Sequence, residues 1–208
     1  MNDVAPLPPE VAPRGRWWLR GLLLLALAAT AWVGWREYDH RAAIREARAA
    51  GFYGHSEDAI RRDSTLDVGE GRDLARLRPL LLRLRPTVMS APACKDTNLD
   101  AFHGLSGLRN LSLVGCTSLQ NVDALQGLSG LKALNLSDCT SLQNVDGLQG
   151  LSGLQILDLR RCTALQNVDG LKGLSGLKEL NLRACPKLPA AAVAELRAAL
   201  PTTEIISD

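Results

Sequence analysis

Aromatic side chains are scarce in this chain of 208 residues, where Phe, Trp and Tyr make up only 4% of the sequence. A surface that binds nucleic acid by stacking bases needs such side chains, so we do not expect one here. Charge of one sign is also lacking, because 24 Lys and Arg residues stand against 22 Asp and Glu residues. The net charge of +2 gives no reason to expect a polyanionic partner.

Recognisable catalytic motifs are lacking as well. The three histidines, His40, His55 and His103, are isolated from one another and from any partner for a nucleophile. No glycine-rich phosphate loop is present, since the recurrent Gly-Leu-Ser-Gly-Leu segment is a turn of a repeat. We therefore predict that the protein is not an enzyme, and we expect no cofactor, metal or small-molecule substrate.

What the sequence does contain is an internal repeat. Copies that open with Gly-Leu-Ser-Gly-Leu start at Gly104, Gly127, Gly150 and Gly173, 23 residues apart each time. A fixed period of this length indicates a stacked repeat architecture. Within each copy, two leucines such as Leu111 and Leu113 alternate with polar residues, which predicts a short strand with one buried face. A single coil cannot bury its leucines alone, so the coils must share one apolar core.

The apolar positions of the first full copy are Leu108, Leu111, Leu113, Cys116 and Leu119. They spell L-x-x-L-x-L-x-x-C-x-x-L, which resembles the signature of the leucine-rich-repeat family apart from one extra residue before the last leucine. The short period is most similar to the internalin-like and cysteine-variant bacterial types. The resemblance implies an α/β repeat solenoid with a parallel concave sheet and helical caps. It also implies 3₁₀ or extended segments on the convex side instead of long helices.

Every cysteine holds the same position of the repeat: Cys94, Cys116, Cys139, Cys162 and Cys185. Spacings of 22 or 23 residues are typical neither of metal ligands nor of a small disulfide scaffold. The resemblance places each thiol inside its coil, as a small apolar group that donates weakly to the backbone of a turn. Neighbouring thiols would then lie close enough to pair under oxidation.

The N-terminal part has a different composition. Residues 1–16 are rich in proline and are expected to be disordered. Residues 17–35 form an apolar run with Trp17 and Trp35 at its ends, which predicts a transmembrane anchor with an aromatic belt. A cleaved secretory signal is the alternative, because Ala29-Thr30-Ala31 fits a cleavage site, although apolar residues continue past it. A buried helix of a soluble protein is a third possibility.

The remaining segments are predicted from their local patterns. Residues 36–50 form a juxtamembrane helix and residues 51–71 a linker with one short helix at 57–62. Residues 72–85 form an N-terminal cap helix that Pro79 kinks or splits, with a membrane-surface helix as the alternative. About five coils occupy residues 86–188, of which 87–103 is a degenerate unit. Residues 189–208 supply a C-terminal cap helix and an edge strand.

Differences between the copies concentrate on and just after the predicted strand. Because side chains alternate along a strand, the residues that flank the buried leucine point to the concave face. That face is the usual partner site in the family that the chain resembles. The predicted partner-binding residues are Asn110, Ser112, Asn135, Ser137, Ile156, Asp158, Arg160, Glu179, Asn181 and Arg183.

These observations predict a membrane-tethered leucine-rich-repeat protein that binds another protein on its concave face. The alternatives are a structural spacer, or a secreted soluble repeat protein of the cell envelope. We expect a single-pass protein of the bacterial inner membrane whose repeats face the periplasm or exterior, although the arginines on both flanks leave the orientation open. The recurrent Asp123, Asp146 and Asp169 resemble a calcium ladder, but their Asn-x-Asp context favours turn capping.

Overall fold

The structure, a computed structural model, describes residues 65–70, 74–97 and 99–208. The segments predicted within residues 1–50, and the short helix at 57–62, lie outside these residues. Among the described residues, no helix combines the length and the apolar character that crossing a membrane requires.

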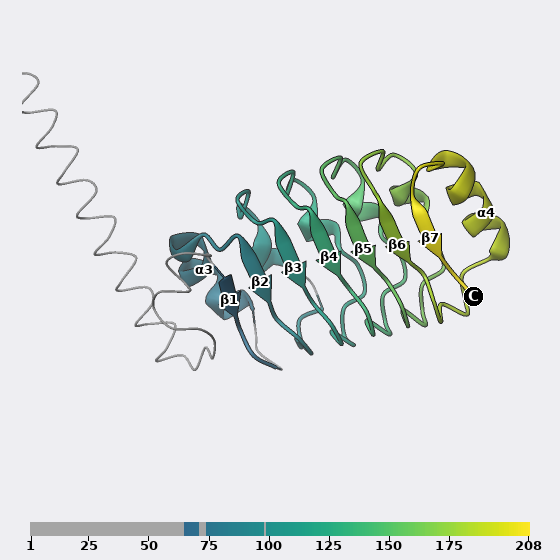
Figure 1. The fold of residues 1–208 in the computed structure, drawn as a ribbon. Helices are drawn as coiled ribbons and strands as arrows, with labels where there is room; N and C mark the ends of the chain where they lie inside the picture. Colours follow the sequence, from purple (N-terminus) through teal and green to yellow (C-terminus); the bar gives the residue numbers. More distant parts are fainter. Residues whose placement is uncertain (1–64, 71–73, 98) are drawn as a thin grey trace, which may run out of the picture. The chain divides into compact units, whose positions relative to one another are not determined.

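Seven short parallel strands form one sheet, and they lie side by side in chain order (Figure 1). Every strand has three residues and pairs in register with the strand of the next coil. The strands are β1 (Thr65–Asp67), β2 (Val88–Ser90), β3 (Asn110–Ser112), β4 (Ala133–Asn135), β5 (Ile156–Asp158), β6 (Glu179–Asn181) and β7 (Glu204–Ile206). The predicted repeat thus forms the stacked parallel sheet that its period of 23 residues requires.

The middle residue of each strand points into the core. Leu111, Leu134 and Leu157 are at most 2% exposed, and the register places them directly beside one another. Met89 holds the same place in the degenerate unit and is buried too. Because each leucine is covered only when a coil stacks on either side, burial of the core depends on the stack and not on any single coil.

On the side of the coil opposite the sheet, the chain forms single turns of 3₁₀ helix. They are η2 (Asp100–Phe102), η3 (Asp123–Leu125), η4 (Asp146–Leu148) and η5 (Asp169–Leu171), and adjacent turns pack on one another. These short turns agree with the expectation that long convex helices are absent from the repeats.

The segment predicted as linker contains a strand that we did not expect. Strand β1 pairs with β2 in parallel, and Leu66 and Val68 are buried, so the linker prediction is wrong at these residues. A single Leu-Asp-Val alternation inside a polar, glycine-rich stretch was too short to be recognised as a repeat. The sequence that follows β1 forms a 3₁₀ turn, η1 (Ala75–Leu77), and helix α3 (Arg78–Leu84), which begins at the predicted split near Pro79.

Helix α3 therefore belongs to the first coil. It lies between β1 and β2 in the chain and packs against η2, at the place where later coils have only a 3₁₀ turn. The cap that we predicted in front of the first coil is instead the helical return segment of that coil. Its buried residues Leu80, Leu81 and Leu84 cover the end of the apolar core.

The C-terminal end follows the prediction closely. Helix α4 (Ala190–Ala199) starts directly after Pro189 and packs against η5, and Leu196 and Leu200 are buried. Strand β7 then adds to the sheet beside β6 (Figure 1). Together they cover the last coil, whose leucines would otherwise face solvent.

Candidate partner-binding face

Three columns of side chains run across the strands on the face of the sheet opposite the core. The first column holds Asn110, Ala133, Ile156 and Glu179, which the register aligns at the first position of successive strands. Asn110 and Glu179 are exposed, and Ile156 is 46% exposed, the largest exposure of any large apolar side chain in the described part. This column therefore presents one apolar side chain between a small and an acidic neighbour.

The second column holds Ser112, Asn135, Asp158 and Asn181, all of them half-buried. Three of these side chains accept a hydrogen bond from the backbone N–H of the residue two positions later. The Oδ1 atom accepts from the N–H of Ser137 at 2.9 Å, of Arg160 at 3.0 Å and of Arg183 at 3.1 Å. Asn135, Asp158 and Asn181 thus stabilise the end of the strand, a role that their variability did not predict.

The third column, one pleat further along, holds Val114, Ser137, Arg160 and Arg183. Both arginines are exposed, as predicted, but Ser137 is fully buried and its hydroxyl has no hydrogen-bond partner in the described part. Serine is the smallest residue of the column, and its side chain does not reach the surface. Ser137 is therefore not presented on the concave surface, contrary to its predicted exposure there.

A recess of about 500 Å³ lies at the C-terminal end of this column. Its lining is Arg160, Arg161, Asn181, Arg183, Ala184 and Asp208. Arg160 and Arg161 make loose ion pairs, at 3.4 Å with Asp158 and 3.5 Å with Asp138, while their side chains stay 51% and 68% exposed. Exposed pairs at this distance contribute little to stability.

Arg161 was not among the predicted partner-binding residues. It sits in the turn after β5, where its backbone is left-handed with φ of 58°, as is that of Asp138 and Ala184 in neighbouring coils. This turn bends the chain back and brings Arg161 beside Arg183, whose carbonyl accepts from the Arg161 N–H at 2.8 Å. The sequence shows that this turn varies between copies, but it does not show on which side of the sheet the turn places Arg161.

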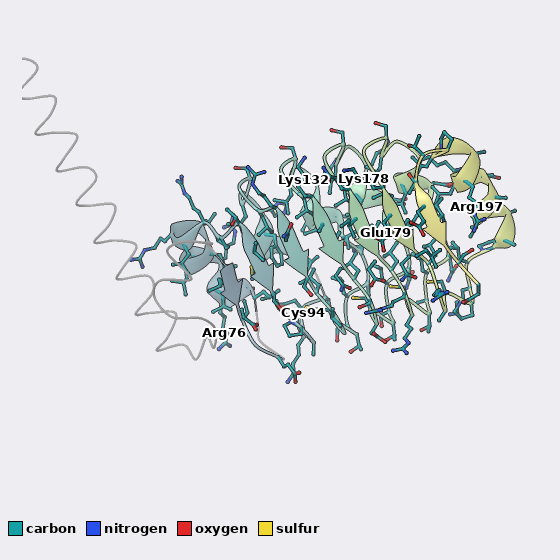
Figure 2. All side chains as sticks on the ribbon, in the orientation of Figure 1. Arg76, Cys94, Lys132, Lys178, Glu179 and Arg197 are labelled. Atoms are coloured by element: carbon teal, nitrogen blue, oxygen red, sulfur yellow. A yellow bond between two sulfur atoms is a disulfide. The ribbon has the colours of Figure 1, made fainter. Side chains whose placement is uncertain are left out.

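Basic side chains also stand at the opposite margin of the sheet. Lys132 and Lys178 directly precede β4 and β6, and Figure 2 shows them at the same margin, with Glu179 on the sheet below. Lysine or arginine side chains thus stand at both margins of the concave face.

The cysteines stack inside the coils, where all five are buried. The thiols of Cys139, Cys162 and Cys185 donate to the carbonyls of Leu113, Leu136 and Leu159 in the preceding coil, at 3.2 to 3.3 Å. Burial raises the pKa of the Cys139 thiol to about 12, and it also raises the pKa of Cys162 and Cys185. These three thiols are therefore held in the inert, protonated form.

Cys94 and Cys116 form a disulfide between the first two cysteine-bearing coils, with Cα atoms 4.8 Å apart. The sequence analysis left pairing between neighbouring cysteines open, and this is the one pair that is joined in the described residues. The in-register stack explains the pairing, because it brings the sulfur atoms of adjacent coils together.

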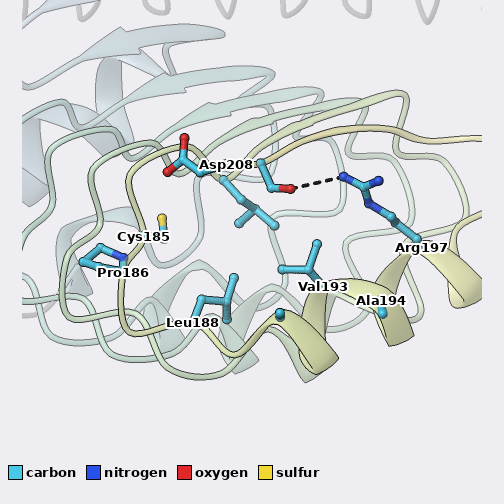
Figure 3. Close-up of a pocket in the computed structure, with 10 residues that line it drawn as sticks. Cys185, Pro186, Leu188, Val193, Ala194, Arg197 and Asp208 are labelled. Carbon is cyan, nitrogen blue, oxygen red and sulfur yellow. Dashed lines mark hydrogen bonds between the residues drawn. The ribbon is translucent and has the colours of Figure 1, made fainter.

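A second recess of about 500 Å³ lies between the last coil and α4 (Figure 3). Leu182, Leu188 and Val193 form its apolar wall, and Arg197 donates to the Ser207 hydroxyl at 3.1 Å. The recess results from the fit of the cap against the last coil.

The Asn-x-Asp turns cap backbone as predicted. Asn121, Asn144 and Asn167 each accept through Oδ1 from the N–H of the aspartate two residues later, at 2.7 to 3.3 Å. Throughout the described residues, no group of His, Cys, Asp or Glu side chains could hold a metal ion.

Comparisons with known proteins bear on the fold. No family model matches the chain, and no curated protein matches it. Among solved structures, an internalin of Listeria monocytogenes is similar with a TM-score of 0.50 and 19% identity, over 69% of this chain and 47% of that one. The match thus spans about half the length of that internalin.

Two further similar structures are internalin C2 of Listeria monocytogenes and a leucine-rich-repeat protein of Leptospira interrogans. Both are 20% identical to this chain. The first has a TM-score of 0.45 over 69% of this chain and 80% of that one, and the second 0.44 over 61% and 38%. The parallel sheet, the 3₁₀ turns and the similarity to the first internalin together show that the repeats of this chain adopt a leucine-rich-repeat solenoid fold.

Proposed function

We propose that this protein is a non-catalytic binding module that holds a protein partner on the concave face of its sheet. The observation that carries the proposal is where the copies differ. Exposed residues elsewhere on the coil, such as Gln120, Gln143 and Gln166, are identical in successive copies. Exposed residues on the concave face differ at nearly every copy. Drift on a solvated surface would have changed both sets, so the difference supports selection for contact on one face.

The chemistry of the face is consistent with a protein interface. Ile156 supplies an exposed apolar centre, and arginines, which are enriched in interfaces, stand beside it. The backbone under these groups is a hydrogen-bonded sheet, so binding requires little ordering of the chain.

Site-specific photocrosslinking from the full chain in its native cell tests the proposal. A photoreactive residue at Ile156 should give one defined protein adduct, and the same residue at Gln143, exposed on another side of the coil, should not. The adduct from Ile156 should weaken when a neighbouring concave residue changes, as in Glu179→Arg. Equal adducts from both faces, or none from Ile156, would contradict a concave binding site.

We further propose that residues 17–35 tether the repeats to a membrane, with the repeats outside the cytoplasm. The support is the apolar run with tryptophans at both ends. Alkaline phosphatase fused after Asp208 in a bacterial host should be active, and the N-terminus should stay intact. A mass that shows a cut near Ala31 would indicate a secreted protein instead, and an inactive fusion would place the repeats in the cytoplasm.

A further inference from the structure

We propose that the concave face recognises an acidic segment of its partner, in which a carboxylate binds among Arg160, Arg161 and Arg183 while an apolar side chain packs on Ile156. This inference rests on the proposed function of the concave face, and it adds the chemical nature of the partner.

The first observation is the crowding of cations. Arg160 and Arg183 hold equivalent positions two residues beyond the ends of β5 and β6, where the backbones of adjacent coils still pair and lie about 4.8 Å apart. Arg161 follows in the turn, and all three line the recess together with one carboxylate side chain, that of Asp208. Asp158 and Asp138, which are not part of the lining, make the loose ion pairs with Arg160 and Arg161. Like charges side by side on a sheet repel one another, so the arrangement is stabilised when an anion binds.

The second observation is that the nearby carboxylates are already engaged. Asp208 accepts through Oδ2 from the Ala184 N–H at 2.6 Å, and Asp158 accepts through Oδ1 from the Arg160 N–H. The pair between Arg160 and Asp158 occupies only the Nε atom, at 3.4 Å. A guanidinium group has five N–H donors, so Arg160 keeps its terminal donors for an incoming carboxylate.

Arg183 strengthens the argument. Its side chain is exposed and makes no ion pair with any residue in the described ranges 65–70, 74–97 and 99–208. A planar guanidinium binds a carboxylate through two parallel N–H donors, which a lysine cannot do. All three cations of the cluster are arginines, and each can bind a carboxylate in this way.

The third observation is the spacing to the apolar group. Ile156 begins β5, and Arg160 lies four residues further along the same chain, a distance of about 13 Å in extended backbone. A partner strand or loop covers this distance in about four residues. We therefore infer a motif with an apolar residue and one or more acidic residues about four positions apart.

The net charge of +2 does not conflict with this inference. The cations that matter are gathered in one recess, and a short acidic peptide needs only that local field. A nucleic acid would need a much longer basic surface and aromatic side chains.

The test uses the full chain purified in a mild detergent. The probe is a fluorescent Gly/Ser peptide that carries one leucine and, four residues later, a run of glutamates. Fluorescence anisotropy should show binding that weakens at about 0.5 M salt. A peptide with glutamines in place of the glutamates should bind at least about tenfold more weakly.

Charge reversal then locates the site. Arg160→Glu with Arg183→Glu should weaken binding of the glutamate peptide at least about tenfold. Lys95→Glu with Lys187→Glu changes the net charge equally outside the recess and should leave binding within about twofold, and Ile156→Ser should weaken binding through the apolar contact.

Equal binding of the glutamate and glutamine peptides, or an equal effect of the two double variants, would overturn the inference. So would the absence of peptide binding, or arginine-dependent binding only to phosphatidylserine vesicles. If a concave crosslink from Ile156 persists in those cases, the proposed function stands and only the acidic chemistry of the partner is wrong.

Discussion

The backbone carbonyl just after each strand accepts a cysteine thiol of the next coil, in addition to the backbone N–H of the cysteine in its own coil. Cys139 donates to the Leu113 carbonyl at 3.3 Å, while the Asn135 side chain accepts from the Ser137 N–H at 2.9 Å. The side chains of Asn135 and Cys139 thereby supply hydrogen bonds to the backbone at the end of a short parallel strand. The repeat retains Cys at this position because the group must be small, apolar and able to donate.

The buried thiols predict how stability depends on pH. The pKa of Cys139 rises from 9.0 to about 12 because burial disfavours the thiolate, so the folded state holds its proton after the unfolded chain has lost it. Stability is therefore fully present below about pH 9 and falls as the pH rises toward 12, by up to about 1.4 kcal/mol per pH unit for each thiol.

Urea unfolding between pH 8 and 10.5, in the presence of a reductant, measures this slope. Cys139→Ala should lower the stability at pH 8 but reduce the slope above pH 9 by the share of one thiol. An unchanged slope in that variant would contradict the assignment of the pH dependence to the thiols.

At the scale of the element, the second glycine of the Gly-Leu-Ser-Gly-Leu segment sets how closely the coils approach. A Cβ atom on Gly176 would lie 2.5 Å from the Ser152 carbonyl oxygen, and one on Gly130 would lie 2.8 Å from that of Ser106. The equivalent Gly107, in the first copy, has open space around it. Glycine is thus required at positions 130 and 176, where the backbone of the preceding copy lies close, and it is not required at position 107.

This difference gives a matched pair of variants. Gly176→Ala should destabilise the protein by about 1–3 kcal/mol, because backbone must shift to remove the overlap. Gly107→Ala should change stability by less than about 0.5 kcal/mol. Chemical denaturation of the two proteins under identical conditions provides the measurement, and equal losses would show that the coil spacing in this region is not as tight as described.

The elements also show how far sequence could predict the fold. The strands β3 to β6, the 3₁₀ turns and α4 follow from a pattern repeated several times, which averages out local ambiguity. Strand β1 has no second copy of its pattern nearby, so its Leu-Asp-Val segment could not be distinguished from a linker. Alternation likewise identified the concave columns. It could not foresee that Ser137 is buried between larger neighbours, or that Arg161 turns toward Arg183.

At the scale of the whole repeat stack, stability depends on an apolar core that adjacent coils form together. Leu134 is 1% exposed between Leu111 and Leu157, and each buried leucine contributes about 1.5–3 kcal/mol. Leu134→Asp should unfold the stack in a single transition, because a carboxylate without a partner enters the shared core.

Ala133→Asp is the control, since it places the same charge one residue earlier on the open face of the same strand. Circular dichroism during heating should show a native-like transition for Ala133→Asp and a missing or strongly lowered one for Leu134→Asp. Similar transitions in both proteins would contradict a core that is shared between coils.

The register that stacks identical leucines also makes the coils interchangeable. Unequal recombination within the gene can remove or add 23 residues, and the new neighbours still meet leucine on leucine and turn on turn. One such event lengthens or shortens the face by one strand spacing, about 4.8 Å. The arginine recess is kept when the event falls before Gly150, because Arg160, Arg161, Arg183 and Asp208 all follow that residue. The length of the concave sheet can thus change by one strand spacing at a time, while the arginine recess keeps its composition.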